Sequence, residues 1–265
     1  MDIPILYEDN ELLVIDKPAR IVVNRAESVK EETVQDWVEY YMSFPRTRES
    51  RVKTGSPIES GMTVDKDFFD RAGIVHRIDK ETSGILLIAK TPETFRELQR
   101  QFKEREVKKT YLALVHGRLV PEEGEIRAPV GRLPWNTERF GIVPGGKEAV
   151  TRYRVIASKA KQSQGDRHVP AAAGPRDDIS VVELYPETGR THQIRVHLKY
   201  INHPIVGDYL YAGRKTSRDD RAHGAPRVML HAWKISCTLP SSGKILAIEA
   251  PIPDDMKRII QNVSA

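Results

Sequence analysis

Residues 76–90 contain the side chains whose types and spacing are best suited to chemistry. The first half of this stretch, His76 to Ser83, is polar and titratable, and Arg77 stands two positions before Asp79. A guanidinium near a carboxylate favours the ionised form of the acid, which a nucleophile requires. Asp79 is therefore the candidate reactive residue. The residues alone also allow an ordinary loop in which Asp79 is a turn residue or a cap.

The elements that would position Asp79 can be predicted from the same stretch. Residues 85–89 form an apolar run that is too short for most helices and predicts a buried strand. The dipeptide Ser83-Gly84 is expected to supply the turn before that strand. Asp79 would then lie on a loop held by a rigid strand, which is where reactive residues are commonly placed.

Two later segments combine regular structure with polar groups. Residues 108–115 predict a strand from their β-branched and aromatic content, and this strand contains Lys109 and Tyr111. Residues 194–201 have helical spacing of apolar side chains, with Thr191 as the expected cap. His192 and His197 do not share a helical face and no cysteine or acidic pattern accompanies them, so we expect no metal site.

Composition limits the class of protein. The chain has 265 residues, of which 39% are hydrophobic and 30% charged, and these fractions fit a soluble globular protein. No apolar run approaches the ~20 residues of a membrane span, and no signal peptide is visible, so a cytoplasmic protein without membrane contact is expected. The single cysteine fits a reducing compartment. The net charge of +5 favours a polyanionic partner.

Three segments are expected to be irregular. Residues 46–61 and 158–178 are polar or low in apolar content, and they predict surface excursions. Residues 214–227 are basic and also predict a loop, which makes them the best candidates for phosphate contacts through Arg214, Lys215 and Arg218.

These motifs resemble those of the RluA-type pseudouridine synthases. The resemblance extends from about Leu12 to Pro253 and rests on three separated segments in the family's order. The segments are His76-Arg77-Ile78-Asp79 with Thr82-Ser83-Gly84, then Lys109-x-Tyr111, and then Gly189-Arg190-Thr191-His192-Gln193-Ile194-Arg195-x-His197. Two positions differ from the family's opening motif: Arg20 stands at the usual glycine and Asn24 at the usual histidine. Arg20 is notable because glycine positions often need a positive φ.

The resemblance implies a role for each motif residue. Asp79 would be the catalytic aspartate, Tyr111 would lie against the target base, and Arg195 would pair with Asp79. Arg77 would fill the space that the flipped base leaves. The further candidates for RNA contacts are His76, Lys109, Arg190, Arg214, Lys215 and Arg218.

The resemblance also implies the architecture. We expect an α+β fold with a mixed, mainly antiparallel bifurcated sheet flanked by helices and loops. Residues 1–265 would form a single catalytic domain, with two subdomains around a central cleft and without the small N-terminal S4 domain of many relatives. The protein is expected to act as a monomer and to need no cofactor, because isomerisation involves no redox step.

The implied activity is isomerisation of uridines in structured RNA, with large-subunit ribosomal RNA as the expected substrate and transfer RNA as the alternative. A hydrolytic nucleosidase or glycosylase would also act at a glycosidic bond, but it often uses two carboxylates, and no second acid recurs in the other motifs. A non-catalytic RNA-binding protein is the remaining alternative. The presence of Asp79, Tyr111 and Arg195 together argues against it.

Overall fold

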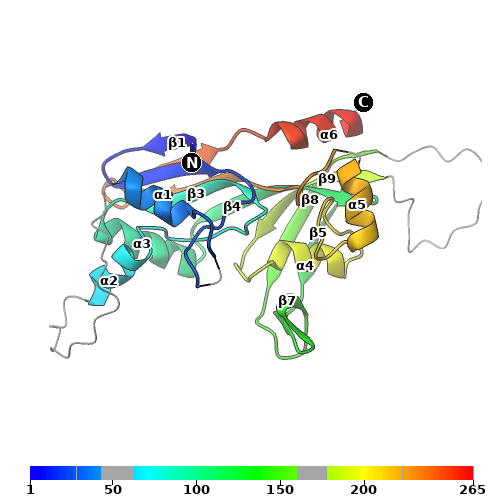
Figure 1. The fold of residues 1–265 in the computed structure, drawn as a ribbon, viewed down its shortest axis with the longest axis horizontal. Coiled ribbons are helices and arrows are strands. Elements are labelled where there is room, and N and C mark those ends of the chain that lie inside the picture. The colour runs from blue at the N-terminus through cyan, green and yellow to red at the C-terminus, as the bar shows by residue number, and fades with distance from the viewer. Residues whose placement is uncertain (28, 43–62, 160–177, 223, 265) are drawn as a thin grey trace, which may run out of the picture. The chain divides into compact units, whose positions relative to one another are not determined.

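The structure, a computed structural model, describes residues 1–27, 29–42, 63–159, 178–222 and 224–264 (Figure 1). The predicted excursion at 46–61, and that at 158–178 except for its ends, lie outside the described residues. The chain divides into two compact units. Unit 1 comprises Met1–Val107 and Ser236–Ala250, and unit 2 comprises Lys108–Ile235 and Pro251–Ala265.

Unit 1 is built on antiparallel strands. Strand β2 (Leu12–Lys17) pairs with β1 (Ile5–Glu8) on one side and with β3 (Ser83–Ala89) on the other. Every residue of β3 is buried, as the apolar run predicted. A fully buried strand is a firm support for the loop that precedes it, and that loop contains Asp79.

Among its described residues, unit 1 also contains three helices. Helix α1 (Val34–Tyr41) begins with a capping box in which Thr33 and Asp36 satisfy each other's backbone N–H groups. Helix α2 (Thr63–Asp70) contacts α3 (Pro92–Lys103), and α3 packs on β3. Thr91 caps α3 and Pro92 occupies its first turn.

Unit 2 is built on antiparallel strands in the order β4-β9-β8-β5. These strands are β4 (Lys108–His116), β5 (Glu123–Arg127), β8 (Val150–Lys159) and β9 (Ile179–Pro186). A separate hairpin joins β6 (Val130–Leu133) to β7 (Asn136–Ile142). The mainly antiparallel pairing predicted for the fold is confirmed.

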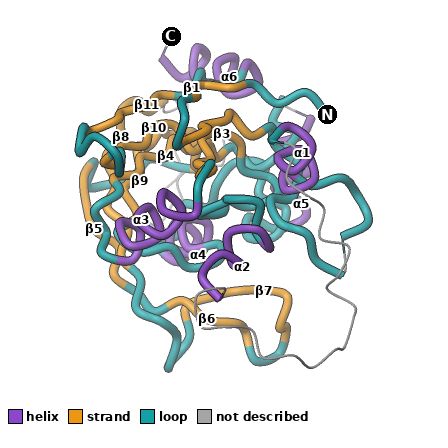
Figure 2. The backbone as a smooth tube through the Cα atoms, turned by 90° about the vertical axis from the view of Figure 1, so that its left-hand side faces the viewer, coloured by secondary structure: helices purple, strands orange, loops and turns teal. Residues whose placement is uncertain are grey.

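Helices cover the strands of unit 2. Helix α6 (Asp254–Ser264) packs on β8 and β9, and α4 (Gln193–Tyr200) contacts β7. In both Figure 1 and Figure 2, α6 lies on one side of β8 and β9, and the β6–β7 hairpin lies on the other. The apolar core of this unit includes Leu112, Val182, Ile194 and Met256.

Strand β10 (Leu230–Thr238) crosses the boundary between the units at residue 235, and it pairs with β11 (Ile245–Glu249). A turn at 240–242 joins these two strands and is followed by Gly243 at φ 65°. Within the described residues, no helix has the length and apolar character needed to cross a membrane.

Three local predictions were wrong. Ser83 and Gly84 lie within β3, and the turn comes earlier, where the N–H of Thr82 donates to the carbonyl oxygen of Asp79 at 3.1 Å. Thr191 does not cap α4; the cap position is His192, which has no side-chain capping bond. Residues 214–222 form helix α5 (Arg214–Ala222) instead of a loop.

Candidate active site

Asp79 lies at the end of the irregular segment 75–79 that enters β3. Its neighbour Ile78 is 5% exposed, so the segment is anchored in the core on one side. Asp79 itself is half-buried, and Arg77 is exposed. An acid that borders both protein and solvent can be held rigidly and still meet a substrate.

The backbone after Asp79 is held by a buried cation. Lys17 is 0% exposed, and its Nζ donates to the carbonyl oxygens of Pro18, Ile21 and Lys80 at 2.8, 2.9 and 3.2 Å. The backbone N–H of Arg20 donates to the same Lys80 oxygen at 2.7 Å. These bonds fix the peptide between Lys80 and Glu81, so Lys17 supports the candidate catalytic loop.

Arg20 has a φ of 70°, in the left-handed region that glycine adopts most readily. The backbone of this turn therefore keeps a positive φ although arginine stands at the family's usual glycine position. The strain is offset in part by the bond from Arg20 to Lys80, because that bond ties the turn to the Asp79 loop.

His76 makes contacts inside unit 1. Its Nε2 accepts the N–H of Leu87 at 3.0 Å, and its ring stacks on Phe102 with centroids 4.7 Å apart. The imidazole thus joins the Asp79 loop to β3 and α3. His76 thus has a structural role in unit 1, and its contact with RNA stays a prediction.

Unit 2 contains the other two predicted catalytic residues. Tyr111 lies near the start of β4, opposite Leu184 of β9, and is half-buried against the apolar core. Lys109 is half-buried on the same strand. Pairing of β4 with β9 fixes the backbone of Tyr111.

The start of α4 is held by Gln193 and not by a cap. The Gln193 side chain accepts from the hydroxyl of Thr188 and the N–H of Arg190, and it donates to the carbonyl oxygen of Val150 and the hydroxyl of Thr151. Four bonds from one amide leave no need for a Thr191 cap. The Nε of Arg190 donates to the carbonyl oxygen of Glu148 at 3.2 Å.

Arg195 is buried on α4 and pairs with Asp208. Its Nε and Nη2 donate to the two Asp208 carboxylate oxygens at 2.7 and 2.9 Å. The side chains of Arg195 and Asp208 are 7% and 0% exposed. The guanidinium carbon also lies 4.9 Å from the ring centroid of Tyr211. This ion pair fixes the guanidinium in one orientation.

His197 is fully buried one turn after Gln193. Its Nε2 donates to the carbonyl oxygen of Ala128 at 3.1 Å, and its Nδ1 accepts from the hydroxyl of Thr151 at 3.0 Å. The neutral ring satisfies both bonds. Burial lowers the pKa of His197, and the bond to Ala128 acts in the opposite direction.

Helix α5 carries the exposed cations Arg214, Lys215 and Arg218. Its buried face contains Ser217 and Asp220. One Asp220 oxygen accepts the N–H of Gly207 at 2.7 Å and lies 3.1 Å from Nε2 of His116. The helix therefore docks through polar contacts and presents its basic side chains to solvent.

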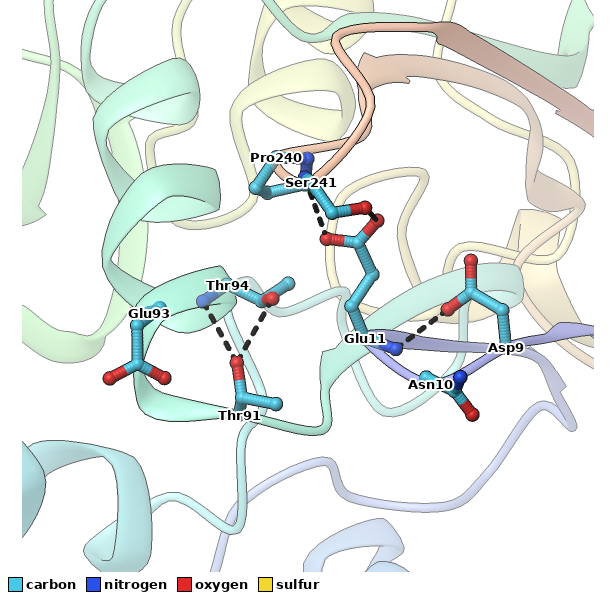
Figure 3. Close-up of a pocket in the computed structure, with 8 residues that line it drawn as sticks. All are labelled: Asp9, Asn10, Glu11, Thr91, Glu93, Thr94, Pro240 and Ser241. Atoms are coloured by element: carbon cyan, nitrogen blue, oxygen red, sulfur yellow. Dashed lines mark hydrogen bonds between the residues drawn. The ribbon is translucent and has the colours of Figure 1, made fainter.

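A pocket of about 600 Å³ in unit 1 lies at the N-terminal end of α3, between the turns at Asp9 and Ser241 (Figure 3). None of the predicted site residues lines it. Its acidic side chains, Asp9, Glu11 and Glu93, make it unsuitable for RNA phosphate. Among the described residues, no group of three or more His, Cys, Asp or Glu side chains could hold a metal ion.

The sequence thus identified His76, Arg77 and Asp79 on one loop of unit 1, and Tyr111 and Arg195 on regular elements of unit 2. It missed Asp208 and Tyr211 as contacts of Arg195, and Lys17 as the support of the Asp79 loop. The only available signal for Asp208 was an acid within the apolar run that follows His203-Pro204.

A family model described as RNA pseudouridylate synthase matches residues 11–200, which include Asp79, Tyr111 and Arg195. The match covers well over half of the chain. The chain belongs to the RNA pseudouridylate synthase family. The three motifs that suggested the family all lie within the matched span.

Relatives in this family are similar over nearly the whole chain. A ribosomal large subunit pseudouridine synthase D of Nitrosomonas europaea is 38% identical over 98% of this chain and 64% of its own length. The RNA pseudouridine synthase YhcT of Bacillus subtilis is 33% identical over 97% of this chain and 71% of its length. This chain therefore spans somewhat less than two thirds of the first relative.

Solved structures of family members share the fold. The human RNA pseudouridylate synthase domain containing 1 is 25% identical, with a TM-score of 0.65, over 99% of this chain and 94% of that chain. The human RNA pseudouridylate synthase domain containing 4 is 21% identical, with a TM-score of 0.66, over 98% and 92%. The predicted fold class is thus confirmed.

Proposed function

We propose that this chain isomerises specific uridines to pseudouridines in structured RNA, with large-subunit ribosomal RNA as the substrate and transfer RNA as the alternative. The observation that carries the proposal is the family match over Asp79, Tyr111 and Arg195, together with the firm anchoring of the Asp79 loop. The names of several relatives, which are ribosomal large subunit pseudouridine synthases, support ribosomal RNA. The protein acts as a monomer in the cytoplasm.

The reaction balances without another reactant. The bond between ribose C1′ and uracil N1 breaks, the uracil turns, and a bond between C1′ and C5 forms. The C5 proton leaves and N1 gains a proton, so the product is an isomer of the substrate. The carboxylate of Asp79 acts at the glycosidic bond, and its ionised form is required for this step.

The neighbouring residues prepare the uridine for Asp79. The target base must leave its stack, at a cost of a few kcal/mol. The exposed, planar guanidinium of Arg77 fills the vacated space and replaces part of the lost stacking. Tyr111 packs on the extruded uracil, and its stacking keeps the ring in place while it turns. Pairing of Arg195 with Asp79 holds the reacting carboxylate in one orientation.

Binding of the RNA backbone is assigned to α5. Arg214, Lys215 and Arg218 are exposed there, and the α5 residue Arg221 lies 5.9 Å from the ring of Tyr209. Cations beside an aromatic face suit both phosphate and base contacts. Arg190 and Lys109 are half-buried and would contribute contacts close to the target nucleotide.

Product analysis tests the proposal and separates it from hydrolysis. The purified protein is incubated with large-subunit ribosomal RNA made by transcription and, in parallel, with transfer RNA transcripts. We expect pseudouridine in digests of at least one RNA and no free uracil. Release of uracil would instead support a hydrolytic glycosylase, and binding without either product would support a non-catalytic RNA-binding protein.

A further inference from the structure

Both carboxylate oxygens of Asp208 accept hydrogen bonds from Arg195. The two bonds, at 2.7 and 2.9 Å, use Nε and Nη2 of the guanidinium. A guanidinium has five N–H donors, so this pairing leaves Nη1 able to donate to another acceptor at the same time. Asp208 can therefore hold Arg195 while Arg195 acts on a second group.

Asp208 is itself fixed by its surroundings. The Oδ1 atom accepts the backbone N–H groups of Leu210 and Tyr211 at 3.0 and 3.1 Å, and the side chain is fully buried. A carboxylate held by backbone donors cannot swing away from its partner. Because Asp208 is fixed, its two hydrogen bonds also fix the position of the Arg195 guanidinium.

Tyr211 limits the guanidinium on a second side. Its ring faces the Arg195 guanidinium at 4.9 Å. Its hydroxyl lies 2.8 Å from Nδ1 of His192 and accepts the N–H of Phe140 at 3.3 Å. The aromatic plane is therefore anchored at its outer end, and the guanidinium is held between a fixed carboxylate and a fixed ring.

We propose that Asp208 is the positioning residue for Arg195 in the isomerisation step. The ring of Tyr211 supports the guanidinium on its other side. This inference rests on the proposed function, in which Arg195 acts on the reacting carboxylate. Asp208 itself touches no substrate. Loss of its charge changes the orientation of Arg195, so the chemical step slows while RNA binding is maintained.

The structure contains a matched control for this test. Arg227 and Asp255 form a second bidentate pair in unit 2, with the same atoms at 2.7 and 2.9 Å, and Arg227 is 5% exposed. Asp255 lies in α6, outside the predicted site. Asp208→Asn and Asp255→Asn therefore remove the same charge from the same geometry, and only one of them acts on Arg195.

The test measures the single-turnover rate of pseudouridine formation and the Kd for the same RNA. In Asp208→Asn, the amide still accepts from Leu210 and Tyr211, but its NH₂ group faces the guanidinium. We expect the rate to fall about 10²-fold, as for a catalytic group displaced by about 1 Å, with the Kd within about twofold. We expect Asp255→Asn to have the wild-type rate and the wild-type Kd. Equal rate losses in the two variants, or a loss of RNA binding alone, would overturn the proposal.

A double variant covers the case in which Asp208→Asn does not fold. Arg195→Gln with Asp208→Asn replaces the buried ion pair by two neutral amides. If Asp208 acts through Arg195, the double variant has the same rate as Arg195→Gln alone. A further slowing in the double variant would contradict the proposal. An inactive wild-type protein would overturn the proposed function, and this inference with it.

Discussion

Individual buried polar residues determine how firmly the candidate site is held. Lys17 contributes no exposed surface, yet its ammonium group holds three carbonyl oxygens, including that of Lys80 beside Asp79. A buried charge is tolerated only when its donors are satisfied, and removing its partners leaves an uncompensated cation. The bond from Lys17 to the Lys80 carbonyl oxygen therefore couples the loop of Asp79 to the buried lysine.

His197 gives a residue-scale prediction for pH dependence. Burial lowers its pKa in the folded protein, so the unfolded state binds a proton more readily. The stabilising contribution of neutral His197 is full above the ordinary pKa of ~6.5 and is lost as the pH falls through the lower folded value. Between about pH 6.5 and about pH 5.5, this loss reaches at most about 1.4 kcal/mol.

Urea unfolding at about pH 7.5 and about pH 5.5 checks this prediction. We expect the unfolding free energy of the wild type to decrease on acidification, and that of His197→Gln to decrease less. The variant is compared with itself at the two pH values, so its lower overall stability does not affect the result. Equal pH dependence in both proteins would contradict the assignment.

Residue contacts of this kind were the hardest part to predict from the sequence. Motif resemblance identified Asp79, Tyr111 and Arg195 because each lies in a patterned segment. Asp208 follows Arg195 by 13 residues. No helix or strand periodicity would indicate from this separation that the two side chains meet. Only the folded path of residues 203–211 brings its carboxylate to the guanidinium.

At the scale of elements, apolar patterning predicted β3 and α4, because their burial depends on apolar packing. It failed for α5. The buried face of that helix contains Ser217 and Asp220, and Asp220 bonds to Gly207 and His116. A helix that docks through hydrogen bonds leaves no apolar stripe in the sequence.

The basic face of α5 leads to a prediction for RNA binding. Replacing Arg214, Lys215 and Arg218 by Gln should weaken binding to all RNAs tested. If each cation contacts a phosphate, the slope of log K against log salt concentration should become shallower by about 2 to 3. The measurement is RNA affinity across a series of salt concentrations.

Helix α3 supplies the matched control for this experiment. Replacing Arg96, Arg100 and Lys103 by Gln removes the same net charge. However, Arg96 and Arg100 already pair with glutamates of their own segment, including Glu93, Glu97 and Glu106. We expect RNA affinity to change little in the α3 variant. Equal losses in the two triple variants would mean that net charge, and not α5, determines affinity.

At the scale of the molecule, the order of the motifs predicted the family and the antiparallel fold before any geometry was considered. The sequence could do so because the family's chemistry constrains several separated segments at once. Asp79 lies in unit 1 and Arg195 in unit 2, an assignment that comes from the structure alone. Their pairing in the active enzyme stays a prediction, and so does the identity of the RNA.

The most direct test of the account compares pseudouridine formation by the wild type and by Asp79→Asn on the same RNA. Asparagine has nearly the size of aspartate but cannot act as an anionic group at the glycosidic bond. We predict that the rate falls roughly 10⁴-fold or more, as for loss of a nucleophile elsewhere, while urea unfolding and RNA affinity stay close to wild type. An Asp79→Asn protein that forms pseudouridine at the wild-type rate would contradict the central claim.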